Sequence, residues 1–238
     1  TDAKWIDPAV ATQAEMYGFT VVEPGAVLAT HLTEVCRRHA DELLTRDATK
    51  HLVDELKKTS PAVVDGLIPS VMTVAEVQGI LQLLLREQVS VRQLGLILET
   101  LGDHAGRSKD PILLAEYVRH RLARQICTRY RNPDDELYVV ALDPALEDRI
   151  RAGYEHTERG MFIRLSPQAV ESICRSVSTE IEKLTTANHT PIVLVSPQIR
   201  AAMKRLTENH LPQLVVLSFN EVTRDTKIVT VGIVSDAA

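Results

Sequence analysis

Two pairs of side chains in the sequence have the types needed for acid–base or metal chemistry. His31 and His39 lie eight positions apart in one predicted helix, near the same face. Helical zinc ligands usually lie four positions apart, so we interpret both as half-buried helix histidines. Asp103 and His104 end another predicted helix, where a histidine suits the helix dipole, and no Ser or Cys nucleophile is tied to them. Neither pair predicts a catalytic site.

The most basic stretch of the chain offers two interpretations. It can be a solvated helix face whose cations lie near the helix C-terminus, where they are favourable. It can also be an interface with acidic neighbours or a phosphate. We adopt the solvated face and keep the interface as the alternative. The stretch comprises Arg119, His120, Arg121, Arg124, Arg129 and Arg131.

Phosphate loops and metal sites are not indicated. Gly153 and Gly160 bracket a predicted loop, but the sequence has no GxxxxGK[ST] pattern. The cysteines Cys36, Cys127 and Cys174 are odd in number, widely spaced and form no CxxC pair. This argues against a disulfide framework or a zinc site and fits reduced thiols in a cytosolic setting. We therefore expect no metal and no cofactor.

Composition favours a folded protein that does not bind nucleic acid. The chain has 238 residues, of which 45% are hydrophobic, enough for one large or two to three small domains. Its net charge of −5 and aromatic content of 4% are unlike the basic, base-stacking surfaces of nucleic-acid binders. No apolar run approaches the roughly 20 residues that span a bilayer. Because the chain starts at Thr1, with neither an initiator Met nor a signal peptide, we expect a fragment of a longer protein.

Three consecutive helices are predicted between Pro69 and Arg131. The first begins at Thr73, whose capping box would include Glu76. The second begins at Ser90 in the same pattern, and the third at Asp110, which caps a helix with proline at its first position. Apolar residues follow each start at helical spacing. They are Val74, Val77, Leu81 and Leu84; Leu94, Ile97, Leu98 and Leu101; and Leu114, Val118, Leu122 and Ile126.

The residues before this stretch are also mostly helical by pattern. Pro24 opens a long helix that we expect to reach Thr45, and another helix should span Asp47 to Lys58. The remaining expectations are a short helix over 8–17, a short strand over 19–22 and a short apolar segment over 63–68.

After residue 131 the pattern changes to alternating strands and helices. Residues 132–136 form a polar linker, and the fully apolar segments 192–195 and 214–217 flank a helix, which predicts a right-handed βαβ unit. We expect a last strand over 227–233, paired as a hairpin with the strand before it. The fold class is therefore mixed α and β: a helical subdomain followed by a small α/β subdomain with a short sheet. The other predicted elements are a strand over 137–141, a helix from Asp143 to Gly153, a loop over 154–162 and a long helix opened by Ser166 and Pro167.

Two long sequence words resemble a known family. LLREQVSVRQLGLILETLGDHA and KDPILLAEYVRHRLARQI are similar to runs in the cytoplasmic region of the FlhA-type export gate family (FlhA/LcrD/InvA) of type III secretion. VVEPGAVLATHLTEVCRRHADELL resembles a further segment of that family, as do DPALE and LPQLVVLSFNEV. The resemblance covers nearly all of the chain and is weakest across 151–190. The acidic VVEP word favours the flagellar branch.

The resemblance implies a docking device with no catalytic residues. Members of this family form a nine-membered homo-oligomeric ring at the cytoplasmic face of the bacterial inner membrane. They receive export chaperone–substrate complexes and contact the export ATPase apparatus, and they reach the membrane only through an N-terminal part that this chain lacks. The threonine of the ATH word belongs to the family's docking dimple and maps to Thr30, with Val27 one turn earlier. These two residues are the expected chaperone-docking site.

The resemblance also implies three parts. Residues 1–45 would be the remnant of a first cytoplasmic subdomain with its long helix, 46–131 an all-helical subdomain and 132–238 the α/β subdomain. Joints are expected near 45–48 and 132–136.

Two other functions remain open from sequence. One is an injectisome (virulence) export gate of the same family. The other, from a different class, is a small α/β hydrolase or transferase, which would need Ser218, Asn220 and Asp143 to converge at strand ends. A helical adaptor without a secretion role fits the sequence words poorly.

Overall fold

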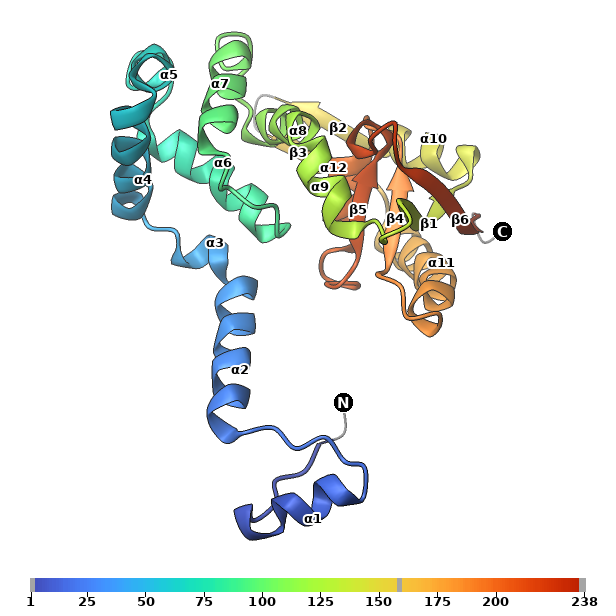
Figure 1. The fold of residues 1–238 in the computed structure, drawn as a ribbon. Helices are drawn as coiled ribbons and strands as arrows, with labels where there is room; N and C mark the ends of the chain where they lie inside the picture. Colours follow the sequence, from blue (N-terminus) through green and yellow to red (C-terminus); the bar gives the residue numbers. More distant parts are fainter. Residues whose placement is uncertain (1–2, 158–159, 236–238) are drawn as a thin grey trace.

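The computed structural model describes residues 3–157 and 160–235. An N-terminal arm projects away from a body in which a helical part packs against an α/β part (Figure 1). The arm contains a 3-10 turn at Pro8–Val10 and the helices α1 (Ala11–Met16), α2 (Pro24–Arg38) and α3 (Ala40–Leu43). None of residues 3–38 is buried. The predicted early helix is confirmed.

Two predictions for the arm are wrong. The long helix stops at Arg38 instead of Thr45, because His39 leaves helical geometry before α3 begins. Its ring lies 3.0 Å from Glu42 Oε1. Residues 19–22 form no strand, since the arm offers no second strand with which their backbone could pair. The hydrophobic spacing of a helix does not reveal a break of one residue, such as that at His39. Likewise, β-branched residues favour an extended backbone but do not supply the second strand that 19–22 would need.

The helical part comprises six helices. Thr73 and Glu76 form the predicted capping box at the start of α6, and Asp110 Oδ1 accepts the amide hydrogens of Ile112 and Leu113 at 2.7 and 3.0 Å at the start of α8. The bounds are α4 (Arg46–Thr59), α5 (Pro61–Leu67), α6 (Val74–Arg86), α7 (Leu94–His104), α8 (Pro111–Arg121) and α9 (Ala123–Tyr130). These helices confirm the predicted run.

Three details of this part differ from expectation. Residues 61–67 form a helix, because Pro61 at its first position lacks only an amide hydrogen that the helix would not use. α7 starts at Leu94, since Ser90 does not cap it and Gln93 occupies the N-cap position. The third predicted helix is two helices, because Leu122 adopts φ −88° and ψ 10° between α8 and α9.

The α/β part is built on a four-stranded parallel sheet with the order β5-β4-β1-β6. β4, α12 and β5 form the predicted βαβ unit. A two-stranded antiparallel hairpin, β2–β3, occupies part of the region predicted as a loop over 154–162, where Gly153 and Gly160 flank β2. Residues 158–159 lie outside the described residues. The elements are β1 (Glu136–Leu142), α10 (Pro144–Ala152), β2 (Tyr154–Thr157), β3 (Gly160–Ile163), α11 (Pro167–Thr186), β4 (Ile192–Val195), α12 (Arg200–Thr207), β5 (Val215–Ser218), a 3-10 turn at Phe219–Glu221 and β6 (Lys227–Val234).

The predicted hairpin between β5 and β6 is wrong. β6 lies parallel to β1 at the opposite edge of the sheet, with Lys227 opposite Glu136. Residues between the strands pack against α9, where Cys127 Sγ lies 3.2 Å from Thr226 Oγ1. Lys227 Nζ then donates to Glu136 Oε1 at 2.7 Å. Because of these contacts, the connection after β5 crosses to the opposite edge of the sheet before β6 begins, and it does not form a hairpin.

The sheet separates two hydrophobic cores. Ile192 and Leu194 of β4 face the core shared with the helical part, whereas Val193 and Val195 face the core under α10, α11 and α12. Strand residues alternate between faces, so the apolar run of β4 serves both cores. Leu137 of β1 joins the helical core across the predicted boundary at 131/132. The mixed α and β fold class is confirmed, and the three-part division stays a prediction.

No helix within residues 3–157 and 160–235 combines the length and apolar character needed to cross a bilayer.

Candidate functional site

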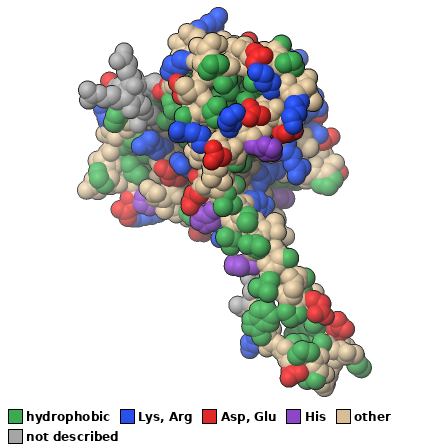
Figure 2. All heavy atoms as spheres, turned by 90° about the vertical axis from the view of Figure 1, so that its left-hand side faces the viewer, with side chains coloured by type: hydrophobic (Ala, Val, Ile, Leu, Met, Phe, Trp, Pro, Cys, Tyr) green, Lys and Arg blue, Asp and Glu red, His purple; other side chains and the backbone are tan. Residues whose placement is uncertain are grey.

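The predicted docking residues lie on the projecting helix α2. Val27 and Thr30 are both exposed and are three positions apart, which places them on the same side of the helix. The apolar side chains around them, Leu28 and Leu32, are 66% and 63% exposed. Figure 2 shows hydrophobic side chains gathered along this arm. α2 therefore presents an uncovered apolar surface that contains both predicted residues.

The histidines flagged in the sequence do not form a site. His31 and His39 are exposed, not half-buried, because nothing covers α2. The His104 ring stacks on Tyr117 with 4.0 Å between ring centroids and an interplanar angle of 8°. In residues 3–157 and 160–235, no group of three or more His, Cys, Asp and Glu side chains could hold a metal ion.

The basic stretch divides into exposed and buried arginines. His120, Arg121 and Arg124 are solvent-exposed, as the first interpretation predicts. Arg119 is not: its residue is only 3% exposed, and it lies among carboxylates. Arg131 pairs with Asp135 and Asp225 at 3.0 and 3.1 Å. The solvated-face interpretation is therefore wrong for Arg119, because α8 turns this residue toward the α/β part.

Arg119 belongs to a buried charge cluster between the helical part and the α/β part. At its centre is Arg200, the first residue of α12, which is 2% exposed. Arg200 donates to both carboxylate oxygens of Glu87, with Nη1–Oε2 at 2.6 Å and Nη2–Oε1 at 3.0 Å, and to Glu116 Oε2 from Nε at 2.6 Å. One guanidinium thus joins the end of α6, the middle of α8 and the start of α12.

Arg119 extends the cluster to the end of β5. Arg119 Nη1 donates to Glu87 Oε2 at 3.2 Å. Arg119 Nη2 lies 2.6 Å from Glu221 Oε1, an ion pair without hydrogen-bond geometry. Glu221 Oε2 also accepts hydrogen bonds from the Ser218 amide and hydroxyl at 2.6 and 3.0 Å. Five charged side chains from four elements therefore meet at one junction: Glu87, Glu116, Arg119, Arg200 and Glu221.

The ionisation of the cluster follows from its pairing. Burial alone would raise the pKa of Glu87, but the charges of Arg200 and Arg119, together with the Arg200 hydrogen bonds, lower it to about 2. Burial acts to lower the pKa of Arg200, and Glu87 and Glu116 outweigh it, so its pKa lies above the ordinary value. These groups therefore stay charged at neutral pH and hold the two parts by fixed ion pairs rather than by proton exchange.

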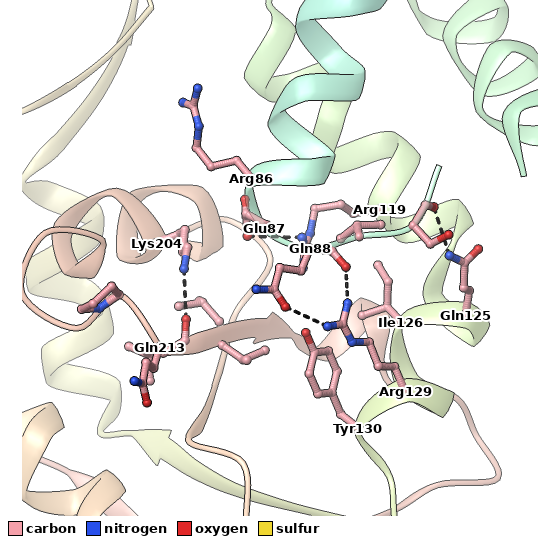
Figure 3. A pocket seen from close by; sticks show the side chains of 16 residues that line it. Arg86, Glu87, Gln88, Arg119, Gln125, Ile126, Arg129, Tyr130, Lys204 and Gln213 are labelled. Carbon is pink, nitrogen blue, oxygen red and sulfur yellow. Dashed lines mark hydrogen bonds and ion pairs between the residues drawn. The ribbon is translucent and has the colours of Figure 1, made fainter. Parts of the chain in front are cut away.

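Two cavities adjoin this cluster, and Arg119 lines both. One of about 230 Å³ lies between the loop after α6, α9 and the start of β5 (Figure 3). The other, of about 490 Å³, is lined by α8 and by residues at the carboxyl ends of β4 and β5.

Of the five residues in the charge cluster, the sequence indicated only Arg119 as a candidate for chemistry. Glu87 and Glu116 lie in the two family words, but ion pairing between them and Arg200 leaves no mark in a linear pattern. The one available signal is that Arg200 shares a helix face with apolar Met203 and Leu206, where an unpaired charge would be unfavourable.

Of the three residues required for the hydrolase alternative, Ser218 and Asn220 line the 490 Å³ cavity, and Asp143 does not join them there. Asp143 Oδ1 accepts the Ala145 amide hydrogen at 2.9 Å as the cap of α10, while the Ser218 hydroxyl donates to Glu221. Asp143 follows β1 and Ser218 ends β5, with β4 between them, so the two strands are roughly 10 Å apart. Both polar groups have local structural partners, and the hydrolase or transferase hypothesis is dropped.

Curated relatives match nearly the whole chain. The chain is 41% identical over 232 residues to the flagellar biosynthesis protein FlhA of Bacillus subtilis, a match that covers 98% of this chain and 34% of that relative. The chain thus spans about a third of the length of this relative.

Two solved structures share the fold. A chain in the Chlamydia pneumoniae CdsV and CdsO protein complex superposes with a TM-score of 0.87 at 25% identity, covering 97% of this chain and 67% of that one. The nonameric SctV-C of EPEC gives a TM-score of 0.82 at 27% identity, covering 95% of this chain and 68% of that one. The profile of the FHIPEP family matches residues 1–227, and the chain therefore belongs to the FHIPEP family.

Proposed function

We propose that this chain is a cytoplasmic, ring-forming and docking part of a flagellar type III protein export gate. The observation that carries the proposal is its similarity to two solved nonamers, SctV-C of EPEC and the EscV cytosolic domain from the type III secretion system. Identity of 41% to a flagellar relative, against 27% to each of those structures, favours the flagellar branch over the injectisome branch. In this function nine copies form a homo-oligomeric ring at the cytoplasmic face of the inner membrane.

The proposed docking surface for chaperone–substrate complexes includes Thr30 and Val27. Its support is physical: α2 projects from the body, and its apolar side chains lie uncovered around these two residues. Exposed apolar patches of this kind mark interaction sites. Contact with the export ATPase apparatus belongs to the same proposal, and the solved complex of CdsV with a second protein supports a partner surface in this fold.

The docking role is tested by calorimetric titration of a late flagellar chaperone–cargo complex into the longer cytoplasmic region that contains this chain. Thr30→Trp should weaken binding without altering thermal stability, because the side chain is exposed. Thr179→Trp, on an exposed face of α11, is the matched control and should bind normally. Unchanged affinity of the Thr30 variant would remove Thr30 from the site.

Ring formation is tested separately, by mass photometry and electron microscopy of the same region. Nonameric particles are expected. A region that stays monomeric at all concentrations would contradict the ring function while leaving the docking result unaffected.

A further inference from the structure

The 230 Å³ cavity is formed by five segments that are distant in the sequence. Its walls are residues 86–90 at the end of α6 and after it, Arg119 of α8, residues between 125 and 130 of α9, Lys204 of α12, and residues 212–216 that lead into β5. Figure 3 shows Lys204 reaching in from one side and Arg129 and Tyr130 from the opposite side. Because an empty cavity of roughly 150 Å³ accommodates benzene, this one has room for a single small group and its waters.

Positive charge dominates the lining. Four cationic residues, Arg86, Arg119, Arg129 and Lys204, face one carboxylate, that of Glu87. Arg86 is paired elsewhere, with Asp41, and Arg119 is paired within the cluster. In the described part of the chain, Arg129 and Lys204 have no carboxylate partner. The cavity lining therefore carries two cations without an ion pair to the described residues: Lys204, which is partly buried, and Arg129, which is exposed.

The Lys204 ammonium has N–H groups that do not donate to any described residue. It donates to the Leu214 carbonyl at 3.0 Å, which uses one of its three N–H groups. Burial lowers the pKa of Lys204; the charge of Glu87 opposes this effect, the charges of Arg200 and Arg119 add to it, and the charge of Glu208 opposes it more weakly. Half-buried ammonium groups without a carboxylate partner are unfavourable unless a ligand supplies one.

Two further lining residues carry donors: Arg119, which lines both cavities, and Tyr130. Arg119 Nε is buried and has no hydrogen-bond acceptor, although the residue is only 3% exposed. The Tyr130 hydroxyl points toward the interior of the cavity (Figure 3). An unpaired buried donor is uncommon in folded proteins and marks a place where an acceptor can bind.

Arg129 is held in place by neutral groups. Its guanidinium donates to the Gln88 carbonyl and, at 2.8 Å, to Gln88 Oε1. Gln88 closes α6 in the left-handed region at φ 58°, and this conformation brings its carbonyl and side chain to Arg129. The arginine is thus oriented without losing its charge.

We propose that this pocket binds the carboxylate of an aspartate or glutamate side chain carried by a partner polypeptide. A carboxylate offers the acceptors that Lys204, Arg119 and Tyr130 lack. A phosphate dianion fits less well, because the charged Glu87 carboxylate on the wall repels a second negative charge. A free small acid would bear the full entropy loss of association, whereas a side chain on a polypeptide shares that loss with other contacts.

The test uses fluorescence anisotropy with this chain and a labelled short peptide of alternating glutamate and alanine. A peptide with glutamine in place of glutamate is the charge control. Arg129→Gln and Lys204→Met should each weaken binding about tenfold, since each removes a charge-assisted contact. Arg124→Gln is the matched control, because it removes the same charge from an exposed position on α9 outside the cavity lining.

Tyr130→Phe keeps all charges and should weaken binding by about tenfold, through the loss of one hydrogen bond to a charged acceptor. This variant guards against misfolding of Lys204→Met, whose loss of the Leu214 contact could disturb β5. Equal binding of the glutamate and glutamine peptides, no binding at millimolar peptide, or equal effects of Arg124→Gln and Arg129→Gln would each overturn the proposal. Competition by inorganic phosphate stronger than by acetate would overturn the carboxylate assignment. None of these results depends on ring formation or chaperone docking.

Discussion

Arg200 and Glu87 are 113 positions apart in sequence, yet the guanidinium of one donates to both carboxylate oxygens of the other. Glu87 ends the helix α6 and Arg200 begins α12, so this pair joins the helical part to the α/β part at a buried point. Bidentate arginine–carboxylate pairs fix orientation as well as distance. The relative position of the two parts should therefore depend on this pair.

Arg200→Met should destabilise the chain by roughly 3–5 kcal/mol, because it leaves the Glu116 carboxylate without its cation and Glu87 with Arg119 alone. Urea denaturation followed by circular dichroism measures the loss. Arg205→Met on the exposed face of the same helix is the control and should change stability by at most about 0.5 kcal/mol. A loss below about 1 kcal/mol for Arg200→Met would show that the cluster contributes orientation without stability.

Acid should weaken the same junction. The pKa of Glu87 is lowered from 4.5 to about 2 in the folded chain, so its stabilising contribution is fully present above pH 4.5 and is lost as pH falls toward 2. A shift of this size corresponds to about 3 kcal/mol. The free energy of unfolding of the parent chain should therefore fall between pH 4.5 and pH 2. That of the Glu87→Gln variant should fall less steeply over the same range. Parallel pH curves for the two proteins would contradict the assignment.

The exposed arm predicts a contrast between two leucines. Leu28 of α2 is 66% exposed and Leu84 of α6 is 1% exposed. Leu28→Ser should change the free energy of unfolding by at most about 0.5 kcal/mol, whereas Leu84→Ala should reduce it by about 2–5 kcal/mol. A large loss for Leu28→Ser would mean that α2 packs against the body in solution, and it would remove the uncovered docking surface.

Local sequence signals predicted local structure well. The Thr73–Glu76 capping box and the Asp110 cap need only neighbouring residues, and both occur where the pattern places them. β6 is different, because its position beside β1 depends on contacts of the connecting residues with α9, such as Cys127 with Thr226. No turn residue or hydrophobic period encodes such a contact.

The candidate sites also differ in whether they depend on one continuous segment or on contacts between distant segments. Thr30 and Val27 were reached through family words and lie on one exposed helix, so a continuous segment was enough to place them. The charge cluster and its cavity bring together residues from α6, α8, α9, α12 and the start of β5. In the sequence, these charged residues cannot be distinguished from ordinary surface residues. Only the tertiary fold, which brings α8 and the start of α12 to the end of α6, makes Arg119 and Arg200 partners of the same carboxylate.

Two glycines should respond to alanine with opposite signs. A Cβ on Gly153 would lie 2.5 Å from Leu165 Cδ2 and 2.6 Å from its Cγ, whereas a Cβ on Gly79 in α6 would meet no atom within 4 Å. Gly153→Ala should therefore cost about 1–3 kcal/mol through overpacking, and Gly79→Ala should stabilise the chain by about 1 kcal/mol because alanine restricts the unfolded chain and favours the helix. Denaturant unfolding of both variants measures the signs. In the double variant Gly153→Ala with Leu165→Ala, the loss from crowding should disappear, leaving only the loss expected for Leu165→Ala. A Gly153→Ala protein as stable as the parent would show that Leu165 moves aside freely, and the packing between α10 and the segment after β3 would then be loose.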